Sequence, residues 1–267
     1  MFDAYRRVLS IPGASAFTLA GLLLRLPLAV YPVAVILFIS LGTGDYGRGG
    51  LLTASYIVGG VVGNPVLSRI ADRAGQRAVL MPSAVSHMLA LLALVVSVRT
   101  GSPVVVQVFA AAAVGVSFVP VGALVRARWV SALRGSSTAL GTALSLESTL
   151  DEVTFVLGPL LATALAIGVD GAAPFVLSAV LVLAGATILH LLRASTPAPQ
   201  RPTAHGRQLL PGLTVGIVAT MAAIGVTLVS IDLAAIAFVG QAGQDGWTGA
   251  VLACSRWAAV SPASPTG

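Results

Sequence analysis

The chain has 267 residues, of which 57% are hydrophobic and only 9% are charged, and its formal net charge is +6. Roughly a quarter of the residues of an ordinary soluble domain are charged, so this chain cannot cover a water-facing surface and we expect a polytopic membrane protein. Every basic residue is an arginine. The absence of lysine excludes both the lysine of a nucleotide-binding P-loop and a lysine Schiff base.

Apolar stretches of about 20 residues or more, the length that crosses a bilayer as a helix, follow one another along the chain. A short amphipathic segment, Met1–Pro12, precedes the first of them, and a Gly-rich turn is expected at Gly42–Gly50. Within the second stretch, Gly59 and Gly63 have the spacing that lets membrane helices pack closely. The first six predicted spans are Gly13–Leu41, Leu51–Ile70, Ala78–Val98, Val104–Val125, Thr138–Ile167 and Ala172–Leu192.

A change in composition divides the chain after the sixth span. Residues 194–208 are polar and rich in proline and arginine, which is typical of a linker. The linker separates an N-terminal six-helix half, residues 1–193, from the start of a second half, residues 209–267. That second part contains a seventh span, Leu209–Val239, and a shorter apolar piece, Trp247–Val260. We therefore predict an all-α membrane protein with six helices, a seventh and part of an eighth.

The arginines predict the orientation through the positive-inside rule. With the N-terminus in the cytoplasm, the outer turns hold only Arg48 and Arg99. The inner segments then hold Arg6, Arg7, Arg69, Arg73, Arg77, Arg126, Arg128, Arg134, Arg193, Arg201 and Arg207. We expect a multi-pass protein of the cytoplasmic membrane, in contact with membrane lipid, with its N-terminus inside.

The segment between the second and third spans reads Ser-Arg-Ile-Ala-Asp-Arg-Ala-Gly-Gln-Arg. It resembles the cytoplasmic loop between helices 2 and 3 of the major facilitator superfamily, whose pattern is Gly-x-Leu-Ala-Asp-Arg-x-Gly-Arg-Arg/Lys. Ser68 replaces the first glycine of that pattern and Gln76 replaces an arginine. The residues that match are Asp72, Arg73, Gly75 and Arg77. The resemblance implies that Asp72 latches a conformation against a helix N-terminus in the second half, whereas the arginines alone could simply set the orientation.

The resemblance also implies a function. Members of the family are secondary transporters that move small molecules by alternating access between two six-helix halves. Protons are the candidate coupling ion, and no cofactor, metal, nucleic acid or catalytic residue is expected, so we do not expect an enzyme. The resemblance covers roughly Ala14–Leu252, so we expect a truncation or a change of reading frame near Ala253. The alternative function is a fragment that is inactive alone or requires a separate C-terminal half.

Ionisable side chains inside membrane spans are costly and usually face the interior of the bundle. Arg25 and the adjacent acids Asp151 and Glu152 are expected at similar depth, so Arg25 could pair with one of the two. Glu147 shares a helix face with Asp151, whereas Glu152 points about 100° away. The five candidates are Arg25, Glu147, Asp151, Glu152 and Asp232.

Two roles for these charges stay open. In the first, one acid carries a proton while Arg25 sets its proton affinity or holds an anionic substrate group. In the second, an ion pair locks the first and fifth spans together. Glu147 could also lie close enough to the cytoplasm to be hydrated, and Asp232 is expected near the outer surface, where a hydrated or structural role is favoured.

Gly158 and Pro159 form the centre of a second family pattern in the fifth span. They resemble the helix-5 motif of drug–proton antiporters, Gly-x-x-x-Gly-Pro-x-x-Gly-Gly, of which only the central Gly-Pro is present. Thr154 occupies the first glycine position, so close helix packing is favoured over a role in antiport. His87 and His190 are isolated in the sequence and lack metal-ligand spacing.

Overall fold

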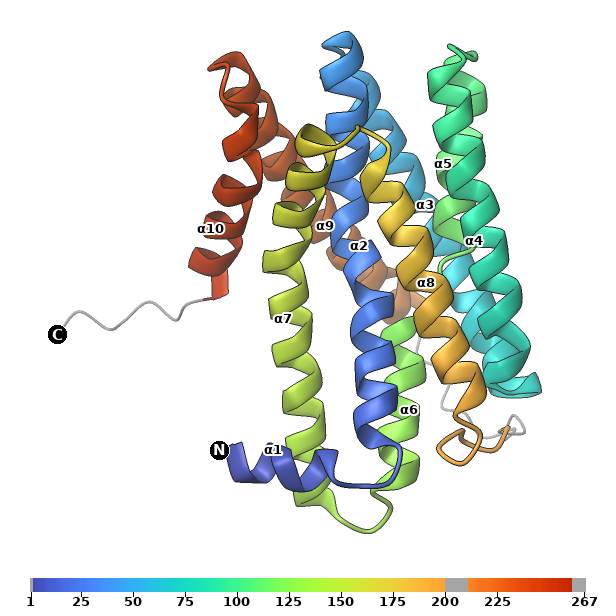
Figure 1. The fold of residues 1–267 in the computed structure, drawn as a ribbon. Coiled ribbons are helices and arrows are strands. Elements are labelled where there is room, and N and C mark those ends of the chain that lie inside the picture. The colour runs from blue at the N-terminus through green and yellow to red at the C-terminus, as the bar shows by residue number, and fades with distance from the viewer. Residues whose placement is uncertain (1, 200–210, 261–267) are drawn as a thin grey trace, which may run out of the picture.

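The computed structural model describes residues 2–199 and 211–260. In these ranges the regular elements are helices, which form an elongated bundle (Figure 1). The elements are α1 (Phe2–Leu9), α2 (Ala14–Thr43), α3 (Tyr46–Ala74), α4 (Gln76–Arg99), α5 (Val104–Val116), α6 (Val121–Ala132), α7 (Ser137–Gly168), α8 (Ala173–Leu191), α9 (Pro211–Gln241), the 3-10 helix η1 (Asp245–Trp247) and α10 (Thr248–Val260). Six spans in the described residues are long and apolar enough to cross a membrane, with α5 and α6 forming one of them. The predicted all-α polytopic fold is confirmed.

Helix α2 runs through the middle of the bundle and contacts α3, α6, α7, α8 and α9 (Figure 1). Its apolar side chains belong to two separate core clusters. Leu24 packs in the cluster near α1, and Val30 packs in the cluster toward the other end. Arg25 lies between them on the same helix and is itself buried. The hydrophobic core is therefore interrupted by a charge about midway along the central helix.

The connection between α3 and α4 is shorter than expected. The sequence predicted a basic turn after Ile70, but α3 continues to Ala74 and α4 begins at Gln76. Gly75 alone makes the bend, with φ at +88°, a conformation that L-residues with a side chain rarely adopt. The predicted turn at Gly42–Gly50 is likewise reduced, because Asp45 accepts a hydrogen bond from the Arg48 N–H and starts α3 early.

The fourth span is broken, which the sequence analysis did not predict. Helix α5 ends at Val116 and α6 begins at Val121, because Pro120 has no N–H and its ring disfavours helix in the residue before it. In a continuous helix the Phe118 N–H would donate to the Val114 carbonyl. At the break it donates to the Gly115 carbonyl instead. Nδ1 of His87 donates to this carbonyl at 3.0 Å, so His87 has a structural role at the break.

Helices α3 and α5 pack with their backbones in close contact. A Cβ added to Gly59 would lie 2.1 Å from a backbone carbonyl oxygen of α5, and one added to Gly63 would lie 2.2 Å from another. In the opposite direction, a Cβ added to Gly115 would lie 1.9 Å from the backbone carbonyl oxygen of Tyr56 in α3. The close helix packing that was predicted from the spacing of Gly59 and Gly63 is therefore present between α3 and α5. At the other side of the bundle, α10 lies along α7, and α1 lies across the end where α7 begins (Figure 1).

Candidate functional site

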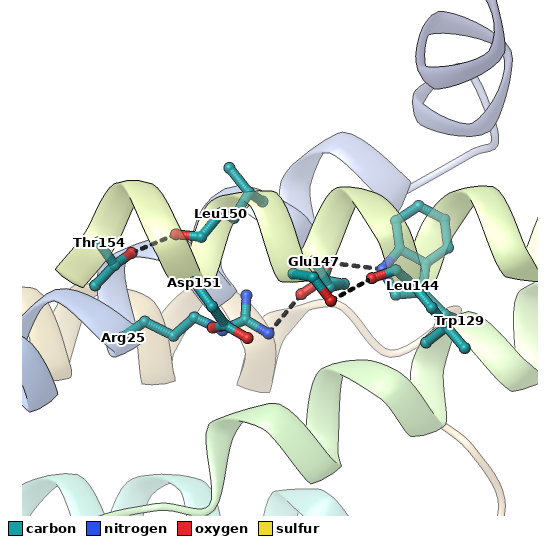
Figure 2. Close-up of polar contacts among 8 residues, drawn as sticks. Arg25, Trp129, Leu144, Glu147, Leu150, Asp151 and Thr154 are labelled. Carbon is teal, nitrogen blue, oxygen red and sulfur yellow. Dashed lines mark hydrogen bonds and ion pairs between the residues drawn. The ribbon is translucent and has the colours of Figure 1, made fainter. Parts of the chain in front are cut away.

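The charge in α2 meets two acids of α7. Nη2 of Arg25 lies 2.5 Å from Oε2 of Glu147, and Nε of Arg25 lies 2.7 Å from Oδ1 of Asp151 (Figure 2). The first approach is an ion pair by distance but not an aligned hydrogen bond, so the attraction there is mainly coulombic. Glu147 and Asp151 are one helical turn apart, which is why a single guanidinium reaches both.

The two acids differ in their surroundings. Glu147 has no exposed surface, and its Oε1 accepts a 2.7 Å hydrogen bond from Nε1 of Trp129 in α6. Asp151 keeps 35% of its side chain exposed. The interpretation that Glu147 is hydrated near the surface is therefore wrong: the chain folds α6 back over this part of α7 and buries the carboxylate. Asp151 is the acid of the pair that solvent can reach.

The formal charges of the cluster do not cancel. Two carboxylates and one guanidinium carry one excess negative charge when all three are ionised. An uncompensated charge in a low-dielectric interior costs free energy, so the partial exposure of Asp151 matters, because water can still screen its charge.

The other two candidate charges lie apart from this cluster. Glu152 is exposed on a different face of α7, as its position one residue after Asp151 requires. Asp232, on α9, is 4% exposed, which argues against a hydrated side chain and agrees with the structural role. The cluster thus contains three of the five charges that the sequence analysis singled out.

Gly158 and Pro159 lie where α7 contacts two other helices. A Cβ on Gly158 would lie 2.4 Å from Cβ of Ala29 in α2, so α2 and α7 approach closely just beyond the charged cluster. On another side of α7, a Cβ added to Gly249 of α10 would lie 2.9 Å from the backbone carbonyl oxygen of Pro159. These contacts give the Gly-Pro pair a packing role.

The residues of the basic motif lie at the end of the bundle where α3 and α4 meet. Ser68 is half-buried, whereas Asp72 and Arg73 are exposed near the end of α3. Arg77 is half-buried on α4, and its Nη2 lies 3.1 Å from Nε2 of His190 in α8. The motif therefore does not join the Arg25 cluster, and its gating role stays a prediction.

One functional residue at this end was missed by the sequence analysis. Arg128 was counted among the arginines that set the orientation, but it is fully buried in α6. Its nitrogens donate to Gln76 Oε1 at 2.8 Å, to the Leu189 and Leu192 carbonyls at the end of α8, and to Ser195 Oγ. The Gln76 amide in turn donates to the Leu124 carbonyl. Gln76 therefore holds Arg128 in a network that joins α4, α6 and α8. In the sequence, the only signal of this network was that Gln76 replaces an arginine of the family pattern.

Comparison with known proteins agrees with this fold. A family model described as Major Facilitator Superfamily matches residues 17–264. The match continues beyond Leu252, where the sequence analysis expected the resemblance to end. A search of curated proteins found no match. Most of the predicted linker, residues 200–208, lies outside the described residues, and the division into 1–193, 194–208 and 209–267 stays a prediction.

Proposed function

The chain belongs to the major facilitator superfamily, and from this membership we propose that it is a secondary transporter that moves small molecules by alternating access. Membership makes it a membrane transporter; the coupling and the mechanism are our proposal. We propose no catalytic role and no cofactor. The observation that supports the proposal best is the buried cluster of Arg25, Glu147 and Asp151, which links α2 to α7 at mid-length.

The two carboxylates around one guanidinium support the proposal that transport is coupled to protons. Asp151 is the proposed proton carrier because its side chain is partly exposed and lies 2.7 Å from Arg25. Glu147 is the proposed anchor, because Trp129 and Arg25 occupy its two oxygens and it has no exposed surface. Protonation of Asp151 would weaken its attraction to Arg25 while Glu147 keeps α2 and α7 together.

We also propose that the protein lies in the cytoplasmic membrane with its N-terminus inside. The support is the distribution of arginines. The junctions of α3 with α4 and of α6 with α7 lie at the end of the bundle that carries α1 (Figure 1), and Arg69, Arg73, Arg77 and Arg134 belong to these two junctions in the sequence. At the other end Arg99 forms an ion pair with Asp170, which offsets its charge. The positive-inside rule then assigns the α1 end to the cytoplasm.

Transport by the purified chain in proteoliposomes tests the proposal. Vesicles with an entrapped pH-sensitive dye would be given a proton gradient and a panel of sugars, amino acids and drug-like cations. We expect one class of solute to accumulate only while the gradient lasts, with proton movement that depends on that solute. If a preparation shown to be folded moves none of these solutes, transport by this chain alone is contradicted.

A second candidate function is that the chain works only together with a separate C-terminal half. In the described residues the six membrane-length spans all precede residue 192, and the helices that follow the linker are α9, η1 and α10. Co-expression with the second half of a full-length relative tests this candidate. Transport that appears only in the co-expressed sample would support it, and transport by the chain alone would exclude it.

A further inference from the structure

The contact between Arg77 and His190 leaves two buried N–H donors without an acceptor in the described part of the chain. An arginine can only donate, so Nε2 of His190 accepts from Nη2 of Arg77 across the 3.1 Å contact. The neutral imidazole then carries its proton on Nδ1. Nδ1 of His190 and Nε of Arg77 are both buried and have no partner among the described residues. Two N–H donors and a positive charge therefore meet at one corner without an acceptor.

The neighbouring side chains do not supply one. Arg128, whose partners Gln76 and Leu189 adjoin Arg77 and His190, can only donate, and its donors are used by Gln76, Ser195 and the end of α8. The segment of residues 194–210, whose Pro199 lies beside Gly75, contains no aspartate or glutamate. A buried donor without a partner costs about 1–3 kcal/mol, so an acceptor from outside the protein would be favoured here.

The chemistry of the corner matches an oxyanion. A phosphate oxygen accepts several hydrogen bonds at once and pairs with the planar guanidinium of arginine. Arg73 and Arg193 are exposed close by in sequence, one before Gly75 and one after α8, and add to the positive potential. Gln76 begins α4, so the N-terminus of this long helix contributes the same sign.

The position of the corner indicates a lipid as the source of the phosphate. Helices α4 and α8 pack side by side and both cross the membrane. Large apolar side chains on both helices are exposed, as a surface in contact with hydrocarbon would be; they are Val85, Leu89, Leu92, Val176, Val180 and Leu191. Arg77 and His190 lie at the end of this helix pair, at the level where lipid headgroups begin.

We propose that Arg77 and His190 bind the phosphate of an anionic phospholipid between the start of α4 and the end of α8. The phosphate accepts from Nε of Arg77 and from Nδ1 of His190 after a small movement of these side chains. The lipid would brace α4 against α8 at the α1 end of the bundle. This site is separate from the Arg25 cluster and does not depend on transport.

Lipid retention by the purified full chain tests the proposal. The protein in neutral detergent would be mixed with phosphatidylglycerol or phosphatidylcholine, and bound lipid would be counted by native mass spectrometry. We expect a preference for phosphatidylglycerol that Arg77→Gln reduces about tenfold, the fold-change that accompanies loss of one charged hydrogen bond. His190→Phe keeps the ring volume, removes the second donor and should reduce the preference as well.

Arg134→Gln is the matched control, because it removes one exposed arginine from the same end of the bundle. It should keep the preference for phosphatidylglycerol. Equal retention of the two lipids by the unmodified protein would overturn the proposal, as would equal loss in Arg134→Gln and Arg77→Gln. Displacement of the lipid by millimolar inorganic phosphate would also overturn it, because the site would then take a free anion instead.

Discussion

Nε1 of Trp129 donates a 2.7 Å hydrogen bond to Oε1 of Glu147, so one buried carboxylate oxygen connects α6 to α7. Trp129 is fully buried against Phe17, and the replacement Trp129→Phe keeps an aromatic ring there but removes the donor together with part of the indole. The acceptor left without a partner should cost about 1–3 kcal/mol of stability. The thermal unfolding midpoint of the purified protein in detergent measures the effect, and an unchanged midpoint would contradict the buried hydrogen bond.

Loss of Arg128 should destabilise the protein far more than loss of Arg126, two residues earlier. Arg128→Met leaves acceptors in Gln76, Leu189 and Leu192 unpaired, and each buried acceptor costs about 1–3 kcal/mol. Arg126 is exposed, so Arg126→Met should change stability by no more than about 0.5 kcal/mol. Unfolding midpoints of the two variants decide the matter, and equal midpoints would mean that Arg128 is not the link among α4, α6 and α8.

A methyl group at the contact between α3 and α5 should not be tolerated. Gly115→Ala would place Cβ 1.9 Å from the Tyr56 oxygen, so the helices must separate, at a cost of about 1–3 kcal/mol or more. Gly141→Ala on α7 meets no atom within 4 Å and should be neutral or stabilising. The yield of monodisperse protein and its unfolding midpoint compare the two, and similar behaviour would contradict the close packing.

The ends of α3 and α8 should lie on the same side of the membrane. In a Cys254→Ser background, Ala74→Cys and Ala198→Cys place single thiols at exposed positions near the basic motif and after α8. An impermeant maleimide added to intact cells should leave both unlabelled and should label Thr43→Cys at the other end of α2. Labelling of only one of the first two would rule out the six-span topology.

Much of the fold could be predicted from the sequence because each span is limited by the thickness of the bilayer. The similar depth of Arg25 and of the adjacent acids Asp151 and Glu152 was sufficient to suggest an ion pair between the first and fifth spans. The predicted partner was one of these two acids. The structure pairs Arg25 with Asp151, as one of these two alternatives, and also with Glu147, whereas Glu152 lies on another face of α7.

The remaining features depend on tertiary contacts that local patterns do not contain. The break at Pro120 was not predicted, and only the structure shows that Nδ1 of His87 donates to the Val114 carbonyl beside it. Arg128 resembled any other arginine near the end of a span. Its burial depends on tertiary contacts with Gln76 of α4 and with the end of α8. Sequence hydropathy therefore predicts the spans, but not which polar side chains the spans enclose.

Proton coupling through Asp151 is the central functional claim, and solute-dependent proton movement in proteoliposomes tests it most directly. Asp151→Asn should abolish accumulation driven by a pH gradient while exchange of the same solute at equal pH continues, because the neutral side chain no longer gains or loses a proton. Asp170→Asn, at an exposed acid outside the cluster, should keep both activities. If the Asp151→Asn protein still couples solute accumulation to the pH gradient as the unmodified protein does, Asp151 is not the proton carrier.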